Sequence, residues 1–402
     1  MKIVAIVCEY NPFHNGHKHQ IEQIKKTFGP DAAIVAIMSG NYVQRGDLAI
    51  LGKFQRARMA VECGVSLVLE IPFPFSLSSA EGFASAAVEI AHKLGTVDIL
   101  SFGSECGDIN TLRLASEHLS SDAFNSALKQ IIKTDGNETL GYAKARTIAF
   151  QKLYGEGFTA LLSSPNNILA IEYLKALRRL GSTIKAHTIL RNGTDKDGAL
   201  ASTSLAGATY LRSLLYGENS ESALPFIPTA THEMLRKAYK NGEMPVKLDN
   251  LSCALLSSLR LENKNFEIAE CGGGLYGHLR HTAQACGTLE ELFQTVSTKK
   301  YTDARIRRAT LYSYFGVTPA HLRESVMYTQ VLAMDGIGQA VLHHIRKTAE
   351  IALITKPADT GKLPAQAKMQ AERAYRADSV YTLAMPKPKA ADFFLTVSPY
   401  RK

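Results

Sequence analysis

The sequence of 402 residues lacks the segments that would place it in or beyond a membrane. No apolar run approaches the roughly 20 residues of a membrane-spanning helix. The nearest candidate, residues 66–77, contains Glu70, Pro72 and Pro74. The apolar run before Glu9 is too short for a secretory signal peptide. We therefore expect a cytoplasmic protein without a membrane partner.

The cysteines form no metal-binding or disulfide pattern. Six are present, and none belongs to a CxxC pair, so we expect neither a structural zinc site nor disulfides. Cys8 and Cys63 lie in apolar runs and are predicted to be buried thiols. No metal ligands are assigned from the sequence.

Two common nucleotide-binding motifs are also absent. The sequence contains neither GxGxxG nor GxxxxGK[ST], so neither a dinucleotide fingerprint nor a P-loop is present. Nevertheless, buried-strand patterns at 3–8, 32–38, 66–71, 97–102 and 183–189 alternate with helical patterns. This alternation predicts an α/β fold with a Rossmann-like, doubly wound parallel sheet.

The character of the chain changes after Glu218. Pro225 and Pro228 indicate a linker, and residues 229–384 are mostly helical by periodicity. We therefore expect two domains, an α/β domain over 1–218 and a mostly helical domain over 219–402.

Positive charge is concentrated in the last quarter of the chain. Residues 300–402 contain 16 Lys and Arg against 8 Asp and Glu, which is +8 of the net charge of +9. Basic residues surround an aromatic one, which favours contacts to phosphates and bases; the group is Lys299, Lys300, Tyr301, Arg305, Arg307 and Arg308. A polyanionic partner is expected. Two alternatives stay open: a solvated basic surface, or arginines buried in salt bridges between helices.

The first strand and the helix after it carry the chemistry. Ile3–Cys8 reads as a buried strand, and a helical pattern follows Gly16. His14 and His17 thus stand at a helix start, where anions bind. Imidazoles there can stabilise charge developing on a phosphate. The alternative is that His14 only caps the helix and His17 faces solvent.

Other polar residues are expected at the same edge of the sheet. These include Gly103 after the fourth strand, Arg191 after the fifth, and Asn166 at another helix start. Asn166 and its neighbour Asn167 could read polar groups or could simply cap the helix. Residues 201–212 resemble a second phosphate cradle, with hydroxyls and Arg212 at a helix start.

These motifs together resemble the bacterial tRNA(Met) cytidine acetate ligase family, within the HxGH nucleotidylyltransferase superfamily. The resemblance runs from end to end and rests on Glu9-Tyr10-Asn11-Pro12-Phe13-His14-Asn15-Gly16-His17, Met38-Ser39-Gly40, Gln44-Arg45-Gly46, Phe102-Gly103-Ser104-Glu105, Ser164-Pro165-Asn166-Asn167-Ile168-Leu169, Lys299-Lys300-Tyr301-Thr302 and Arg305-Ile306-Arg307-Arg308. The chain departs from the family pattern at 192–198 and 206–212.

The resemblance implies a ligase that uses ATP to convert acetate to acetyladenylate, and then acetylates N4 of the wobble cytidine of elongator tRNA(Met). His14 and His17 would be catalytic. ATP is expected as a substrate, with Mg²⁺, and no tightly bound cofactor is expected. By position, ATP would bind to Val7, Cys8, Glu9, Tyr10, Asn11, Pro12, Phe13, His14, Asn15, Gly16, His17, Lys18, His19, Gln20, Gly103, Asn166 and Arg191. The tRNA would bind the basic group in residues 299–308.

Two other functions are compatible with parts of the sequence. A small-molecule adenylyltransferase of the pantetheine-phosphate or nicotinamide-mononucleotide type would not need the basic helical domain. A tRNA-binding protein that had lost catalysis would not need His14, Gly16 and His17.

Overall fold

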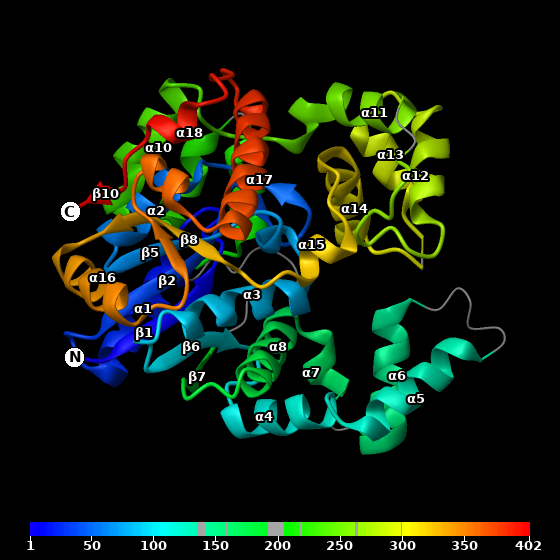
Figure 1. Ribbon diagram of the computed structural model, residues 1–402, viewed down its shortest axis with the longest axis horizontal. Coiled ribbons are helices and arrows are strands. Elements are labelled where there is room, and N and C mark those ends of the chain that lie inside the picture. Colours follow the sequence, from blue (N-terminus) through cyan, green and yellow to red (C-terminus); the bar gives the residue numbers. More distant parts are fainter. Residues whose placement is uncertain (135–140, 157–158, 192–204, 218, 262–263, 299) are drawn as a thin grey trace.

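An eight-stranded sheet positions the candidate site, and helices cover both of its faces (Figure 1). The computed structural model describes residues 1–134, 141–156, 159–191, 205–217, 219–261, 264–298 and 300–402. The strand order is β10-β8-β5-β2-β1-β6-β7, with β9 beside β8. The strands are β1 (Ile3–Cys8), β2 (Ala33–Ser39), β5 (Leu67–Ile71), β6 (Ile99–Ser104), β7 (Lys185–Leu190), β8 (Tyr328–Met334), β9 (Ala352–Ile354) and β10 (Tyr400–Arg401).

The central strands are apolar because both of their faces are buried. Val4 and Ile6 of β1 pack into one layer, and Ala5 packs into the opposite layer. The first layer includes α1 (Asn15–Phe28), α2 (Lys53–Glu62) and α9 (Ala208–Tyr216). The second includes α3 (Ala80–Lys93), α8 (Pro165–Arg179) and α16 (Gly336–Thr348). The predicted doubly wound α/β fold is therefore confirmed.

The direction of winding reverses at β1. From β1 the chain moves to β2 and β5, and then returns to place β6 on the other side of β1. These pairs are all parallel, so β1, β2, β5 and β6 end at the same edge of the sheet. Ligands of open α/β sheets bind at such a switch point.

Helices make up most of the remaining described chain. Between β6 and β7 lie α4 (Ile109–His118), α5 (Asp122–Lys133), α6 (Tyr142–Tyr154) and α7 (Thr159–Ser163). Later helices are α10 (His232–Lys240), α11 (Ser252–Leu261), α12 (Leu275–Ala283), α13 (Leu289–Val296), α14 (Asp303–Phe315), α15 (Pro319–Arg323), α17 (Ala365–Tyr381) and α18 (Phe393–Thr396). Short 3₁₀ helices are η1 (Phe75–Leu77), η3 (Ser220–Phe226), η4 (Thr229–Thr231), η5 (Leu248–Leu251), η6 (Pro357–Lys362) and η7 (Thr382–Ala384). None of the helices described is long and apolar enough to cross a membrane.

The sheet crosses the domain boundary expected at residue 218, which itself lies outside the described residues. Strand β8 pairs antiparallel with β5, and β10 pairs parallel with β8. The region 219–402 is mostly helical, yet it also supplies these strands to the central sheet. Every residue of β8 is buried, but its partner strand lies more than 250 positions earlier. No local pattern identifies such a pairing.

A small hairpin and a group of helices complete the arrangement. The hairpin consists of β3 (Tyr42–Val43) and β4 (Asp47–Leu48), which follow β2. Helices α11 to α14 gather at one side of the molecule (Figure 1). All six cysteines are free thiols; Cys8 and Cys63 are half-buried rather than fully buried, because each lies at the end of its element.

Candidate nucleotide site

The loop between β1 and α1 lies at the switch point and is held by later segments of the chain. The side-chain oxygen of Asn11 accepts a hydrogen bond from Ile50 N at 2.8 Å. The main-chain oxygen of Asn11 accepts one from Arg212 Nη1 at 2.8 Å. Asn15 Nδ2 donates to Pro225 O at 3.1 Å. The loop is therefore fixed by contacts from both halves of the chain.

His14 caps helix α1 with its side chain. Its Nδ1 accepts from Gly16 N at 3.1 Å, and its main-chain N–H donates to His17 Nδ1 at 3.2 Å. The two imidazoles stack with their centroids 3.7 Å apart. Gly16 leaves room for this fold-back, since a Cβ there would lie 2.9 Å from Cε1 of His14.

These hydrogen bonds determine which ring nitrogens carry protons. In each imidazole Nδ1 accepts, so the proton of the neutral ring is on Nε2. No hydrogen bond among the described residues uses either Nε2 atom. The capping of His14 expected as an alternative is thus present. His17, however, is half-buried against Tyr10 and Phe13 rather than turned to solvent.

The environment keeps both imidazoles neutral. Burial lowers the pKa of His14 to about 3, with further contributions from Arg191 and Arg212. Burial also holds the pKa of His17 well below its ordinary value, aided by His14 and Arg191. Two neutral N–H donors thus lie at the amino end of α1, and Arg191 and Arg212 are near enough to lower the pKa of His14. Such a group of donors suits a polyphosphate.

The residues of segment 7–20, all of which were predicted to bind ATP, differ in how deeply they are buried. Tyr10, Asn11, Pro12, Phe13 and His14 are buried. Lys18 and His19 are exposed on α1, and the other members, Val7, Cys8, Glu9, Asn15, Gly16, His17 and Gln20, are half-buried. Tyr10 has φ +48°, a left-handed conformation that costs a non-glycine residue free energy and is common at functional loops.

Gly103 and Arg191 lie together at the ends of β6 and β7. Arg191 N donates to Ser104 O at 2.9 Å, which continues the strand pairing. The aliphatic part of the Arg191 side chain lies directly over Gly103. A Cβ at position 103 would therefore be only 2.9 Å from Arg191 Cγ. The structure therefore brings both predicted residues to the edge of the sheet at which His14 and His17 lie. Residues 192–204, which include one departure from the family pattern, lie outside the described residues.

The side chain of Asn166 is hydrogen-bonded to the carboxylate of Glu105, a contact that the sequence did not predict. Glu105 Oε1 accepts from Asn166 Nδ2 at 2.7 Å and from Asn166 N at 3.1 Å. Its Oε2 accepts from Asn167 N at 2.7 Å, and Asn167 Oδ1 accepts from Cys106 N at 3.0 Å. Neither asparagine is a simple cap. Instead, Glu105 satisfies the amino end of α8.

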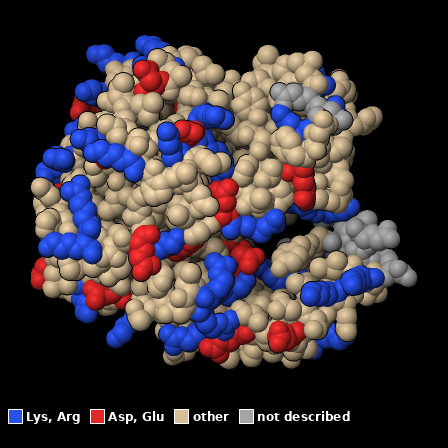
Figure 2. All heavy atoms as spheres, in the orientation of Figure 1, with Lys and Arg blue, Asp and Glu red and all other residues tan. Residues whose placement is uncertain are grey.

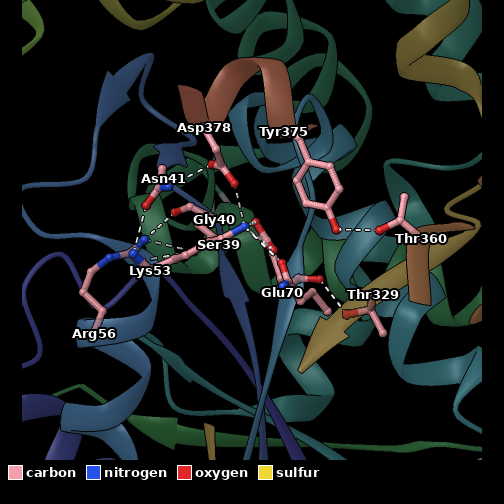
Figure 3. A network of polar contacts seen from close by, with 11 residues as sticks. Ser39, Gly40, Asn41, Lys53, Arg56, Glu70, Thr329, Thr360, Tyr375 and Asp378 are labelled. Carbon is pink, nitrogen blue, oxygen red and sulfur yellow. Dashed lines mark hydrogen bonds and ion pairs between the residues drawn. The ribbon is translucent and has the colours of Figure 1, made fainter. Parts of the chain in front are cut away.

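Arg56 is a supporting residue that sequence reasoning missed. Its side chain is completely buried and bonds only to main-chain oxygens, those of Glu9, Ser39, Gly40 and Leu51. It thereby joins the residue after β1 to the end of β2, and Figure 3 shows its contacts with Ser39 and Gly40. No local signal in the sequence indicated a buried arginine at this position.

Lys53, on the same face of α2, stands in a buried cluster of charges (Figure 3). Its Nζ lies 2.7 Å from Glu70 Oε2 and 2.7 Å from Asp378 Oδ2. Asn41 Nδ2 donates to Asp378 Oδ1 at 2.8 Å, and Asn41 Oδ1 accepts from Lys53 N. Asp378 belongs to α17, so this cluster ties the end of β2 to the carboxyl-terminal half.

The predicted tRNA-binding group does not form one exposed surface. Lys299 lies outside the described residues, and Lys300 is exposed, with Nζ 3.1 Å from Gly273 O. Tyr301 is buried, and its hydroxyl donates to Gly273 O. The expectation that Tyr301 stacks on bases is therefore corrected, because its ring packs inside the helical layer.

The three arginines of α14 differ in exposure. Arg308 is buried and bonded to Glu270, with Nη2 to Oε2 at 2.7 Å, so it does not reach the surface as expected. Arg305 is half-buried and donates to Glu270 O and Gly272 O. The side chain of Arg307 is 37% exposed, and its Nη1 lies 3.9 Å from Asp47 Oδ2. The alternative of buried arginines thus holds for Arg308, although its partner Glu270 lies in the loop between α11 and α12 and not in a helix.

Comparisons with known proteins show the family to which the chain belongs. The family model of the HIGH Nucleotidyl Transferases matches residues 1–393. The tRNA(Met) cytidine acetate ligase of Thermoanaerobacter sp. (strain X514) is 34% identical over 392 residues, which cover 96% of each chain. That of Thermosipho africanus (strain TCF52B) is 35% identical over 381 residues, covering 93% of this chain and 89% of its own. The chain belongs to the tRNA(Met) cytidine acetate ligase family.

Solved structures extend the family likeness to three dimensions. Thermotoga maritima TmcAL bound with alpha-thio ATP matches 100% of this chain and 99% of its own, with a TM-score of 0.92 and 29% identity. Its apo form matches with a TM-score of 0.93 over the same shares. The fold of this family member is thus that of a protein whose structure holds an ATP analogue.

Proposed function

We propose that the chain is an ATP-dependent ligase that acetylates the wobble cytidine of elongator tRNA(Met). In the first step a carboxylate oxygen of acetate attacks the α-phosphorus of ATP, and the bond to pyrophosphate breaks. In the second step the N4 amine of cytidine attacks the acetyl carbonyl. AMP leaves with the electrons of the broken bond, and the amine loses one proton. The product is N4-acetylcytidine.

The observation that carries the proposal is the paired neutral imidazoles at the start of α1. Negative charge grows on the phosphates as pyrophosphate leaves, and Nε2–H donors of His14 and His17 can stabilise it. Because each imidazole is neutral and donates through Nε2–H, it stabilises the phosphate charge without giving up its proton. Near-full-length similarity to proteins named tRNA(Met) cytidine acetate ligase supports the choice of acetate and tRNA as the other substrates.

We assign ATP to the switch point, with His14 and His17 as the catalytic residues. The proposed ATP-binding residues are those predicted from the sequence, namely 7–20 with Gly103, Asn166 and Arg191, of which Asn166 also donates to Glu105. Mg²⁺ is proposed to enter with ATP. No cluster of three or more His, Cys, Asp or Glu among the described residues is arranged to hold a metal ion. Magnesium that accompanies ATP is bound largely through phosphates and water.

For tRNA we propose the region 219–402, with Lys299, Lys300, Arg305 and Arg307 as contacts. Tyr301 and Arg308 are left out because they are buried. Basic side chains also cover α5 and α16 on the face drawn in Figure 2. Exposed examples are Lys129 and Lys133 on α5, and Arg346 and Lys347 on α16. The proposed tRNA surface therefore need not be confined to α14.

The deciding experiment is exchange of radioactive pyrophosphate into ATP, with and without acetate. Exchange that requires acetate and does not require tRNA is the expected result. Exchange supported by a small phosphorylated substrate but not by acetate would instead indicate an adenylyltransferase of the pantetheine-phosphate or nicotinamide-mononucleotide type. A protein that binds tRNA but gives no exchange would have lost catalysis.

A further inference from the structure

The tip of the β3–β4 hairpin lies between helix α14 and the loop that joins β1 to α1, which we call the nucleotide loop. Gln44 N donates to the carboxylate oxygen Oε1 of Glu9 at 2.9 Å. Gln44 O accepts from Arg308 Nη1 at 3.1 Å. The main chain of one residue therefore connects the residue after β1 with a helix in the last quarter of the chain.

The hairpin and α14 are in close contact, so movement of one affects the other. Gly46, at φ +79°, faces the backbone of α14. A Cβ at this position would lie 2.6 Å from Arg307 Cβ and 2.8 Å from Arg308 N. Packed contacts of this kind transmit displacement, since protein interiors have few voids to absorb it.

Arg308 is held as firmly on its other side. Its Nε donates to Glu270 at 3.0 Å, and its Nη2 donates to Glu270 Oε2 at 2.7 Å. The Arg308 side chain is 8% exposed and that of Glu270 is 17% exposed. The planar guanidinium can bond to Glu270 and Gln44 together, which a lysine ammonium at the same place would not reproduce.

Glu9, at the other end of the chain of bonds, is held at two atoms. Its carboxylate accepts from Gln44, and its main-chain oxygen accepts from Arg56. The next residue is Tyr10, in its left-handed conformation, and the loop then leads to His14. A shift of Glu9 therefore changes where the loop starts and where its histidines lie.

We propose that Arg308 is a positioning residue for the nucleotide site, acting through Gln44 on Glu9. Its role is to fix the loop that carries His14 and His17, not to bind tRNA. The proposal rests on the proposed function and deepens it. It predicts that a residue of the helical half affects the adenylation step even when tRNA is absent.

The test measures kcat and KM for ATP in acetate-dependent pyrophosphate exchange without tRNA. The variant is the pair Arg308→Met with Glu270→Met, which removes both charges and so leaves neither buried without a partner. We expect kcat/KM to fall about 10- to 100-fold, as small misplacements of catalytic groups do. Unchanged exchange by a folded variant would overturn the proposal.

A matched control is available in the same half of the molecule. Arg373 and Glu324 form another partly buried pair, with Nη1 to Oε2 at 3.1 Å and side chains 15% and 34% exposed. No hydrogen bond or ion pair described for either residue reaches the nucleotide loop. Arg373→Met with Glu324→Met should keep exchange within about twofold of wild type, because distant sites act independently. An equal loss in this control would show that general loosening, not positioning, is responsible.

A milder pair of variants covers the case in which the double substitution prevents folding. Arg308→Lys keeps a charge beside Glu270 but weakens the bond to Gln44. Combined with Glu9→Ala, it should give a double-mutant cycle in kcat/KM with strong non-additivity, at melting temperatures near wild type. Independent effects, or wild-type exchange by Arg308→Lys, would overturn the proposal. Absence of acetate-dependent exchange in the wild type would instead count against the proposed function.

Discussion

His14 and His17 each have a structural role at the start of α1, and that role makes the chemical role proposed for them possible. Because Nδ1 of each ring accepts a backbone hydrogen bond, Nε2 carries the proton that can be donated to phosphate. Sequence spacing predicted both residues but treated helix capping and phosphate binding as alternatives. Spacing alone does not tell which ring nitrogen the backbone occupies, so the compatibility of the two roles was not visible.

Replacing either histidine should reduce adenylation strongly and stability only slightly. For His14→Ala and for His17→Ala we expect exchange to fall roughly 10²- to 10³-fold, the usual effect of removing one oxyanion donor. Loss of a helix cap should cost about 1 kcal/mol. Exchange kinetics and thermal melting measure the two effects separately.

His321 provides a control for the capping role alone. Its Nδ1 accepts from Thr318 N at 3.1 Å at the start of α15, as His17 Nδ1 does at α1. His321→Ala should therefore show a similar loss of stability with normal exchange. Normal exchange in His14→Ala and His17→Ala would remove these residues from the catalytic site.

Glu70 makes a prediction about pH. Burial raises the pKa of its carboxyl from 4.5 to about 7; Lys53 lowers it and Asp378 raises it. The folded protein thus holds this proton more tightly than the unfolded chain does. The resulting stability is complete below pH 4.5 and is lost as the pH rises through about 7.

The variant Glu70→Gln carries no titratable proton and should lack this dependence. Its melting temperature relative to wild type should rise between about pH 4.5 and about pH 8, while Lys53 keeps Asp378 as a partner. Calorimetry across this range measures the difference. A constant difference would show that Glu70 does not titrate between these limits in the folded protein.

At the level of elements, the sequence identified those with local patterns and missed those defined by distant partners. The strands β1, β2, β5, β6 and β7 were predicted within a few residues because each is an apolar run bounded by turns. Strand β8 was missed, since its apolar run stands among helices and its partner is β5. The burial of Lys53 and Arg56 could not be predicted, because their partners lie in β2, β5 and α17.

The contact between the hairpin and α14 can be tested at one glycine. Gly46→Ala should destabilise the protein by more than the roughly 1 kcal/mol that a left-handed alanine costs, because its Cβ would meet the α14 backbone. Gly181→Ala is the matched control, with φ +57° and no atom within 4 Å of a Cβ. Chemical denaturation compares the two. Equal losses in both variants would mean that the hairpin can separate from α14 without cost.

At the level of the whole molecule, the nucleotide sheet and the basic helices are not separate bodies. Strands β8 and β10 belong to the sheet, and α17 contributes Asp378 to the buried charges beneath the end of β2. The charge excess in residues 300–402 drew attention to the region, but charge counts cannot distinguish a buried arginine from an exposed one. Arg308 contributes to that excess but is buried in an ion pair with Glu270.

The exposed part of that charge should govern the salt dependence of tRNA binding. Lys300 is exposed, and the side chain of Arg307 is 37% exposed. Replacing both with Ala should weaken tRNA affinity and reduce the log–log salt slope by about 0.7–0.9 for each lost phosphate contact. Exchange without tRNA should stay normal, because neither side chain takes part in the hydrogen bonds that join Arg308, Gln44 and Glu9. The control, Lys237→Ala with Lys240→Ala, removes two exposed charges from α10 and should leave the slope unchanged. A folded Lys300→Ala, Arg307→Ala variant with the wild-type slope would move the tRNA surface elsewhere, to basic faces such as those of α5 and α16.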